Sequence, residues 1–148
     1  MAIAYFDASA LVKLIVDEPG SEIAEAIWDG CDAAVSSRLA FAEVCAALAA
    51  AGRRGDLDES EVVDCEERWQ QVWSSVRPVE LSENVEQSAG LLARRHRLRG
   101  ADAVHLASAL VLDTADLVVA VWDHRLHDGA VAEHLAVVPA TVQRPANN

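Results

Sequence analysis

The sequence predicts an α/β protein with a central, mainly parallel sheet of about four to five strands flanked by helices. Short apolar runs alternate along the chain with longer segments whose apolar residues recur at helical spacing. The segments around Asp7 and Asp123 also share one arrangement, a buried strand followed at once by a carboxylate and then a helix. In such sheets ligands bind beyond the carboxyl ends of the strands, where both carboxylates are expected to lie.

The elements are separated by turn residues, in particular at 17–20, 30–32, 52–56 and Gly100. Uncharged or β-branched runs between these breaks predict strands, and amphipathic segments predict helices. The predicted strands are 2–6, 33–37, 78–81, 117–122 and 135–138. The predicted helices are 9–16, 21–28, 39–51, 58–76, 82–98 and 101–112, with one more following Asp123.

Length and composition favour one domain over residues 1–142, followed by a loose tail at 143–148. The hydrophobic fraction of 52% excludes a disordered chain. No apolar run reaches the ~20 residues of a membrane span, and no signal peptide is recognisable, so a cytoplasmic protein without membrane contact is expected. The three cysteines form no C-x-x-C pair, which argues against a disulfide framework or a zinc site.

A net charge of −12 argues at first against a nucleic-acid partner. The basic residues are unevenly distributed, however, because four arginines fall within Arg94–Arg99, just before Asp102. A local arginine patch of this kind can grip a phosphate backbone if cations screen the surrounding carboxylates. The sequence therefore leaves a nucleic-acid substrate open.

Glu43 is the most unusual residue of the chain. It is the only charged residue in a helix that is apolar nearly all round, and its helical neighbours are Leu39, Ala40, Ala46 and Ala47. A buried carboxylate is costly unless it is paired or bound to a metal ion. The alternative is an exposed glutamate with no role.

Four carboxylates are candidate site residues: Asp7, Glu43, Asp102 and Asp123. Each of the three aspartates could instead cap a helix, but capping does not explain a glutamate within a helix. With no Lys or His ion partners nearby in sequence, such carboxylates suit Mg²⁺ or Mn²⁺, which prefer oxygen ligands. Sites of this composition commonly hydrolyse phosphate esters.

Four segments carry a family resemblance: Phe6–Lys13, Ala42–Val44, Gly100–Ala107 and Val121–Leu126. In this order they resemble a PIN domain, most closely the VapC-type toxins of bacterial toxin–antitoxin pairs, from Ala2 to about Pro139. The resemblance implies that the four carboxylates hold Mg²⁺ or Mn²⁺ for endonucleolytic RNA cleavage. It also implies a homodimer and a cognate antitoxin that covers the groove and the active site.

By the same resemblance, Ser9 helps to orient the site. We expect Asp7 and Asp102 to bind the principal metal ion, Glu43 to position the ion or the attacking water, and Asp123 to complete the pocket or a second site. Arg99 and Arg125, with the arginines before them, are candidates for binding the RNA backbone. His105 is expected to be a packed, structural histidine. The chain departs from many relatives at Val121, where they have Thr or Ser.

Two alternatives stay open at this point. The chain could be a PIN nuclease of RNA or DNA processing outside a toxin–antitoxin pair, or an inert PIN module that only binds its antitoxin. Two other acidic-pocket α/β classes are disfavoured. A receiver domain needs paired acids at the first strand and a late lysine, and a haloacid-dehalogenase-type phosphatase needs D-x-D, whereas this chain has Asp7-Ala-Ser9.

Overall fold

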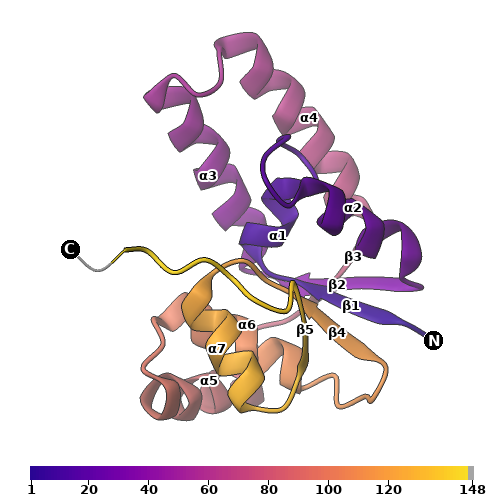
Figure 1. Cartoon of the computed structure of the whole chain (residues 1–148), viewed down its shortest axis with the longest axis vertical. Coiled ribbons are helices and arrows are strands. Elements are labelled where there is room, and N and C mark those ends of the chain that lie inside the picture. Colours follow the sequence, from indigo (N-terminus) through magenta and orange to yellow (C-terminus); the bar gives the residue numbers. More distant parts are fainter. Residues whose placement is uncertain (147–148) are drawn as a thin grey trace.

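The computed structural model describes residues 1–146 and contains one five-stranded sheet with helices on both faces (Figure 1). All neighbouring strands are parallel, in the order β3-β2-β1-β4-β5, so the predicted fold class is confirmed. The strands are β1 (Ile3–Phe6), β2 (Ala33–Ser37), β3 (Val76–Val79), β4 (Leu117–Ala120) and β5 (Ala136–Val138). The helices are α1 (Ala8–Lys13), α2 (Ser21–Gly30), α3 (Ala40–Arg54), α4 (Glu59–Ser75), α5 (Glu83–His96), α6 (Gly100–Leu110) and α7 (His124–Ala132).

Two hydrophobic cores lie on opposite faces of the sheet. Successive side chains of a strand point to opposite faces, so Tyr5 of β1 enters the core formed with α5, α6 and α7. Its neighbours Ala4 and Phe6 enter the core formed with α1, α3 and α4. Figure 1 shows the same two layers, with the hairpin of α3 and α4 extending away from the sheet.

The strand order places a topological switch point between β1 and β4. From β1 the chain continues to β2 on one side, and it returns much later to place β4 on the other side. Phe6 pairs with Ala120 at the carboxyl ends of these two strands, and the Asp7 N–H donates to the Ala120 carbonyl. The crevice beyond a switch point is the usual ligand site of an open parallel sheet.

Some predicted boundaries are wrong. β3 begins two residues earlier than predicted, because Val76 is buried in the sheet whereas Leu81 is 60% exposed. α5 ends at His96 and not near Leu98, since Arg97 adopts a left-handed conformation (φ 54°) that turns the buried Leu98 into the core. Gly100 is the first residue of α6 and not merely a break.

Other predictions stay open. No helix within residues 1–146 is long and apolar enough to cross a membrane, and a cytoplasmic location stays a prediction. The division into a domain at 1–142 and a loose tail at 143–148 also stays a prediction, and positions 147–148 lie outside the described residues. Within the tail, Arg144 forms an ion pair with Asp128 at 2.9 Å.

Candidate active site at the switch point

Asp7 is the first residue after β1 and caps α1. Its carboxylate accepts hydrogen bonds from the Ala10 N–H at 3.0 Å and from the Ser9 hydroxyl at 2.6 Å. Burial raises the pKa of Asp7 to about 6, and the charge of Asp123 adds to the rise, although His105, Ser9 and Ala10 act in the opposite direction. Burial therefore makes the ionised form of Asp7 unfavourable, and the carboxylate is stabilised either by binding a proton or by a cation beside it.

Asp123 and Asp102 lie at the starts of α7 and α6, the helices that follow and precede β4 along the chain. Asp123 caps α7 and accepts the N–H groups of Arg125 and Leu126. Asp102 lies in the first turn of α6, whose N-cap is Arg99, so the capping interpretation is correct for Asp7 and Asp123 but wrong for Asp102. Burial raises the pKa of Asp102, and the charge of Asp123 raises it further.

Arg99 is the basic side chain nearest to these two acids. Its Nε lies 3.3 Å from Asp102 Oδ2, and its Nη2 lies 3.4 Å from Asp123 Oδ2. The side chain is 66% exposed, so each contact is weak as an ion pair. Arg125, the other predicted substrate-binding arginine, contacts Asp123 only through its backbone N–H.

Glu43 enters the site from α3, on the other side of the sheet from α6. Its Oε1 lies 2.5 Å from Nε2 of His105, whose Nδ1 lies 2.7 Å from the Tyr5 hydroxyl. The sequence showed no such partner near Glu43, and it is the fold that brings His105 to Glu43 from 62 residues away. The Glu43 side chain is also not fully buried, since 29% of it is exposed.

His105 is surrounded by the candidate acids. Burial lowers the pKa of His105, but its hydrogen bond to Glu43 and the charges of Asp7, Glu43 and Asp102 outweigh this effect and leave the pKa raised. The sequence could have indicated that His105 lies near Asp102, since positions 102 and 105 lie on the same face of a helix. Nothing in the sequence indicated that the Tyr5 hydroxyl contacts His105.

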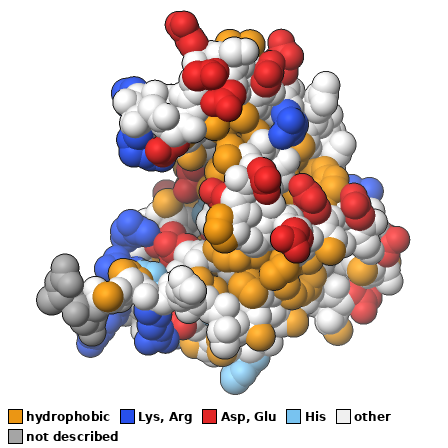
Figure 2. Space-filling view, turned by 45° about the horizontal axis from the view of Figure 1, so that its top comes forward, with side chains coloured by type: hydrophobic (Ala, Val, Ile, Leu, Met, Phe, Trp, Pro, Cys, Tyr) orange, Lys and Arg blue, Asp and Glu red, His pale blue; other side chains and the backbone are white. Residues whose placement is uncertain are grey.

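The predicted arginine patch is divided by the fold. Arg95 forms an ion pair with Glu133 of the α7 end at 2.7 Å, and His96 also contacts Glu133. Arg99 instead faces the acids of the switch point. Figure 2 shows basic side chains gathered on one side of the molecule, beside a hollow with acidic side chains at its edge.

The donor set fits a hard divalent cation. The carboxylates supply only oxygen ligands, and among residues 1–146 the side chain of buried Asp7 accepts hydrogen bonds only from neutral groups, the Ser9 hydroxyl and the Ala10 N–H. Within residues 1–146, however, no three acidic, His or Cys side chains approach closely enough to hold one ion together in this conformation.

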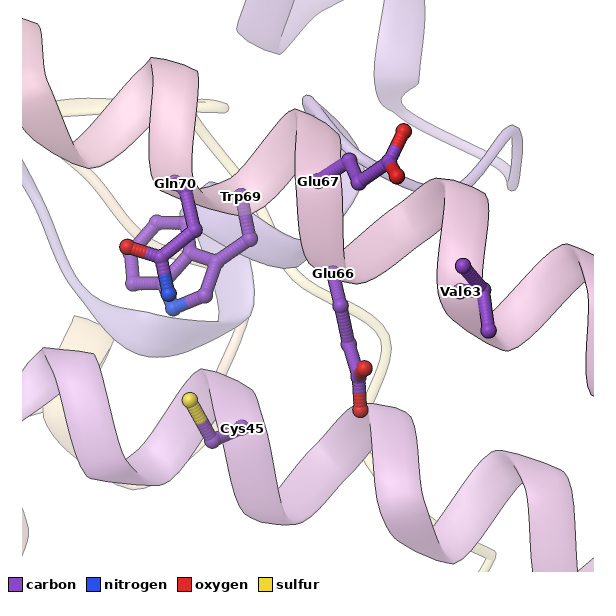
Figure 3. A pocket seen from close by; sticks show the side chains of 6 residues that line it. All are labelled: Cys45, Val63, Glu66, Glu67, Trp69 and Gln70. Atoms are coloured by element: carbon purple, nitrogen blue, oxygen red, sulfur yellow. The ribbon is translucent and has the colours of Figure 1, made fainter.

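A separate pocket of about 320 Å³ lies between α3 and α4 (Figure 3). Cys45 of α3 faces it, and Val63, Glu66, Glu67, Trp69 and Gln70 of α4 complete its lining. None of the four candidate acids lines this pocket. Its two glutamates come from one helix, without the convergent arrangement found at the switch point.

The Ser9 hydroxyl connects the segments that follow β1 and β4. It donates a hydrogen bond to Asp7 and accepts one from the Trp122 N–H at 3.0 Å. We expect Ser9→Ala to weaken Mn²⁺ binding by about 10-fold, since residues that orient metal ligands have effects of this size. Isothermal titration calorimetry measures the affinity. Ser9→Thr retains the hydroxyl and is the matched control; equal affinities of wild type and Ser9→Ala would contradict this role.

Comparison with known proteins gives the family. Residues 4–130 match the PIN domain. The chain belongs to the PIN domain family. Ribonuclease VapC49 of Mycobacterium tuberculosis is 63% identical over 140 residues, which cover 95% of this chain and 97% of that protein. Ribonuclease VapC46 of the same species is 33% identical over 138 residues, or 93% of this chain and 98% of that protein.

Several solved structures share the fold of this chain. A toxin–antitoxin complex from Klebsiella pneumoniae has a TM-score of 0.66 at 18% identity, with 95% of this chain and 99% of that chain covered. Mycobacterium tuberculosis VapC20, described as a sarcin-ricin loop cleaving toxin, has a TM-score of 0.62 at 15% identity, with 84% and 93% covered. At these identities the likeness concerns the fold alone.

Proposed function

We propose that this protein is an endoribonuclease that acts as the toxin of a type II toxin–antitoxin pair. The observation that carries the proposal is the 63% identity, over almost the full length of both chains, to ribonucleases of the VapC type. The acidic crevice at the switch point supports it independently, because oxygen-only sites of this kind suit metal-assisted hydrolysis of phosphodiesters.

PIN ribonucleases generally depend on a divalent metal ion. We propose Mg²⁺ or Mn²⁺ for this chain, held by Asp7 and Asp102, with Glu43 positioning the ion or the attacking water and Asp123 completing the pocket. When bound, the ion supplies a water of lowered pKa and positive charge for the phosphate. Asp7 and Asp102 must both be ionised for this role, which their raised pKa values oppose until a cation is present.

Substrate binding is assigned to Ser9, Arg99 and Arg125. Arg99 is mostly exposed and lies between Asp102 and Asp123, so it can turn from these carboxylates to an RNA phosphate without losing a buried contact. The net charge of −12 opposes RNA binding elsewhere on the surface. We therefore propose that RNA binding is weak without divalent ions.

We also propose two protein partners, a cognate antitoxin and a second copy of this chain. One solved structure with this fold is a toxin–antitoxin complex from Klebsiella pneumoniae, which supports an antitoxin partner. The homodimer is proposed from the family resemblance, and the exposed apolar side chains on and beside α5 and α6 are candidates for its interface. They are Leu81, Leu91 and Val111.

Cleavage of mixed cellular RNA by antitoxin-free protein tests the nuclease. We expect cleavage with Mg²⁺ or Mn²⁺, loss of cleavage in EDTA, and recovery when Mn²⁺ is added back. Asp102→Asn should remain inactive throughout, and Glu67→Gln on the surface of α4 is a control acid that should cut like wild type. Equal cutting by wild type and Asp102→Asn would contradict the assigned site.

The same preparation distinguishes the alternatives. Cleavage confined to one RNA species, and suppressed by the product of an adjacent small gene, is expected for a toxin. Cleavage without any such inhibitor would favour a nuclease of RNA or DNA processing. Mn²⁺ binding with no cleavage of any RNA would favour an inert module that binds an antitoxin.

A further inference from the structure

His105 lies in a fully enclosed position between β1 and α3. It is 2% exposed, and Tyr5 is completely buried. Both ring nitrogens are in use, Nδ1 toward the Tyr5 hydroxyl at 2.7 Å and Nε2 toward Glu43 Oε1 at 2.5 Å. Substrate therefore cannot reach the ring, and within residues 1–146 the one candidate acid to which His105 forms a hydrogen bond is Glu43.

The direction of these hydrogen bonds follows from their partners. An ionised carboxylate only accepts hydrogen bonds, so Nε2 of His105 carries the hydrogen that faces Glu43. The Tyr5 hydroxyl can either donate to Nδ1 or accept from it. The N–H that faces Glu43 is therefore present in both charge states of the ring, and the arrangement does not depend on titration of His105.

The network also joins the two layers of the molecule. Glu43 belongs to α3, which packs on one face of the sheet, and His105 belongs to α6 on the other face. Within residues 1–146, His105 is the only side chain that forms a hydrogen bond with the Glu43 side chain. Without this hydrogen bond, a partly exposed glutamate side chain with several rotatable bonds would sample many orientations.

From these contacts we infer that Tyr5 and His105 are positioning residues that hold the Glu43 carboxylate in the orientation it needs at the metal site. His105 occupies Oε1, which leaves Oε2 for the ion or for its water. The inference rests on the proposed function, because it assigns Glu43 to a metal site. It differs from the expectation of a merely packed histidine, which predicts lower stability but unchanged metal affinity.

Mn²⁺ affinity of the full chain, measured by calorimetry, tests the inference. His105→Leu removes the donor and fills the cavity, and it should weaken binding by about 10- to 100-fold, the range for residues that support metal ligands. Tyr5→Phe removes only the hydroxyl and should weaken binding by a smaller factor. His105→Gln retains an N–H at similar reach and should recover most of the affinity lost in His105→Leu.

A double-mutant cycle with Glu43→Ala separates positioning from packing. In the Glu43→Ala background, His105→Leu should cause no further loss of Mn²⁺ affinity, although it still lowers the melting temperature. In RNA cleavage, Tyr5→Phe should lower kcat and leave KM unchanged, because the buried Tyr5 and His105 do not contact RNA. If His105→Leu fails to fold, the same cycle with Tyr5→Phe gives the answer.

Either of two results would overturn this inference and leave the proposed metal site intact. The first is wild-type Mn²⁺ affinity in both His105→Leu and Tyr5→Phe. The second is a loss of Mn²⁺ affinity on His105→Leu that is equally large in the wild-type and Glu43→Ala backgrounds. Wild-type protein that binds no Mn²⁺, or Glu43→Ala that binds it as tightly as wild type, would contradict the proposed metal site and this inference with it. The two failures are therefore distinguishable.

Discussion

Asp7→Asn should abolish metal-dependent RNA cleavage and, at the same time, make the metal-free protein more stable at neutral pH. Loss of cleavage by more than about 100-fold is expected, since even residues that only support metal ligands have effects of about 10–100-fold. The gain in stability follows from burial, which raises the pKa of Asp7 from 3.8 to about 6. Asparagine retains an oxygen for the Ala10 N–H, so the cap of α1 survives.

The pH dependence of this gain has a definite sign. Because the folded state binds the Asp7 proton more tightly than the unfolded state, the stabilising contribution is complete below about pH 3.8 and is lost as the pH rises through about 6. At pH 7 the ionised carboxylate therefore lowers the free energy of unfolding, by up to about 3 kcal/mol. Asp7→Asn removes this cost at pH 7, and its advantage shrinks as the pH falls toward 4.

Urea unfolding in EDTA, at pH 7.5 and at pH 5, measures the difference between wild type and Asp7→Asn. Asp128→Asn, an exposed acid on α7, controls for the general loss of one negative charge from a chain of net charge −12. Added Mn²⁺ should stabilise wild type and leave Asp7→Asn unaffected. A variant less stable than wild type at pH 7.5 would show that burial of Asp7 carries no such cost.

Trp69→Ala should lower the free energy of unfolding by about 3–5 kcal/mol. Trp69 is 1% exposed, and it packs against Phe41 and Trp73 with ring centroids 5.9 and 5.4 Å apart. This aromatic group holds the hairpin of α3 and α4 together above the sheet. A loss of this size is a large part of the 5–15 kcal/mol that stabilises a typical domain.

Trp69→Phe should cost much less than Trp69→Ala, for a reason specific to this site. The indole N–H of Trp69 has no hydrogen-bond partner within residues 1–146, so phenylalanine loses no hydrogen bond and removes a buried donor. Chemical denaturation compares both variants with Val63→Ala, a half-exposed position of α4 that should change stability by less than about 0.5 kcal/mol. Equal losses in Trp69→Ala and Val63→Ala would contradict the packing described.

Much of the architecture follows from local patterns in the sequence. The parallel sheet was predictable because β1, β4 and β5 are short apolar runs, and because Asp7 and Asp123 follow two of them. The boundaries that differed depend on neighbours. Val76 continues the apolar face of α4, and only its pairing with Ala34 of β2 makes it the start of β3. The left-handed conformation at position 97 was not predictable, because this position is occupied by arginine and not by glycine, which usually marks such a turn.

The sequence by itself determined the fold class and the carboxylates that follow the strands, because these features depend on spacing along the chain, and its motifs carried the resemblance to the PIN family. Tertiary structure decided the partners of those carboxylates. The sheet places β4 beside β1, which lets the charge of Asp123 act on Asp7, and α6 carries His105 to Glu43 across 62 residues. Hydrogen bonds and charge interactions depend on distance in space, which spacing along one segment does not reveal.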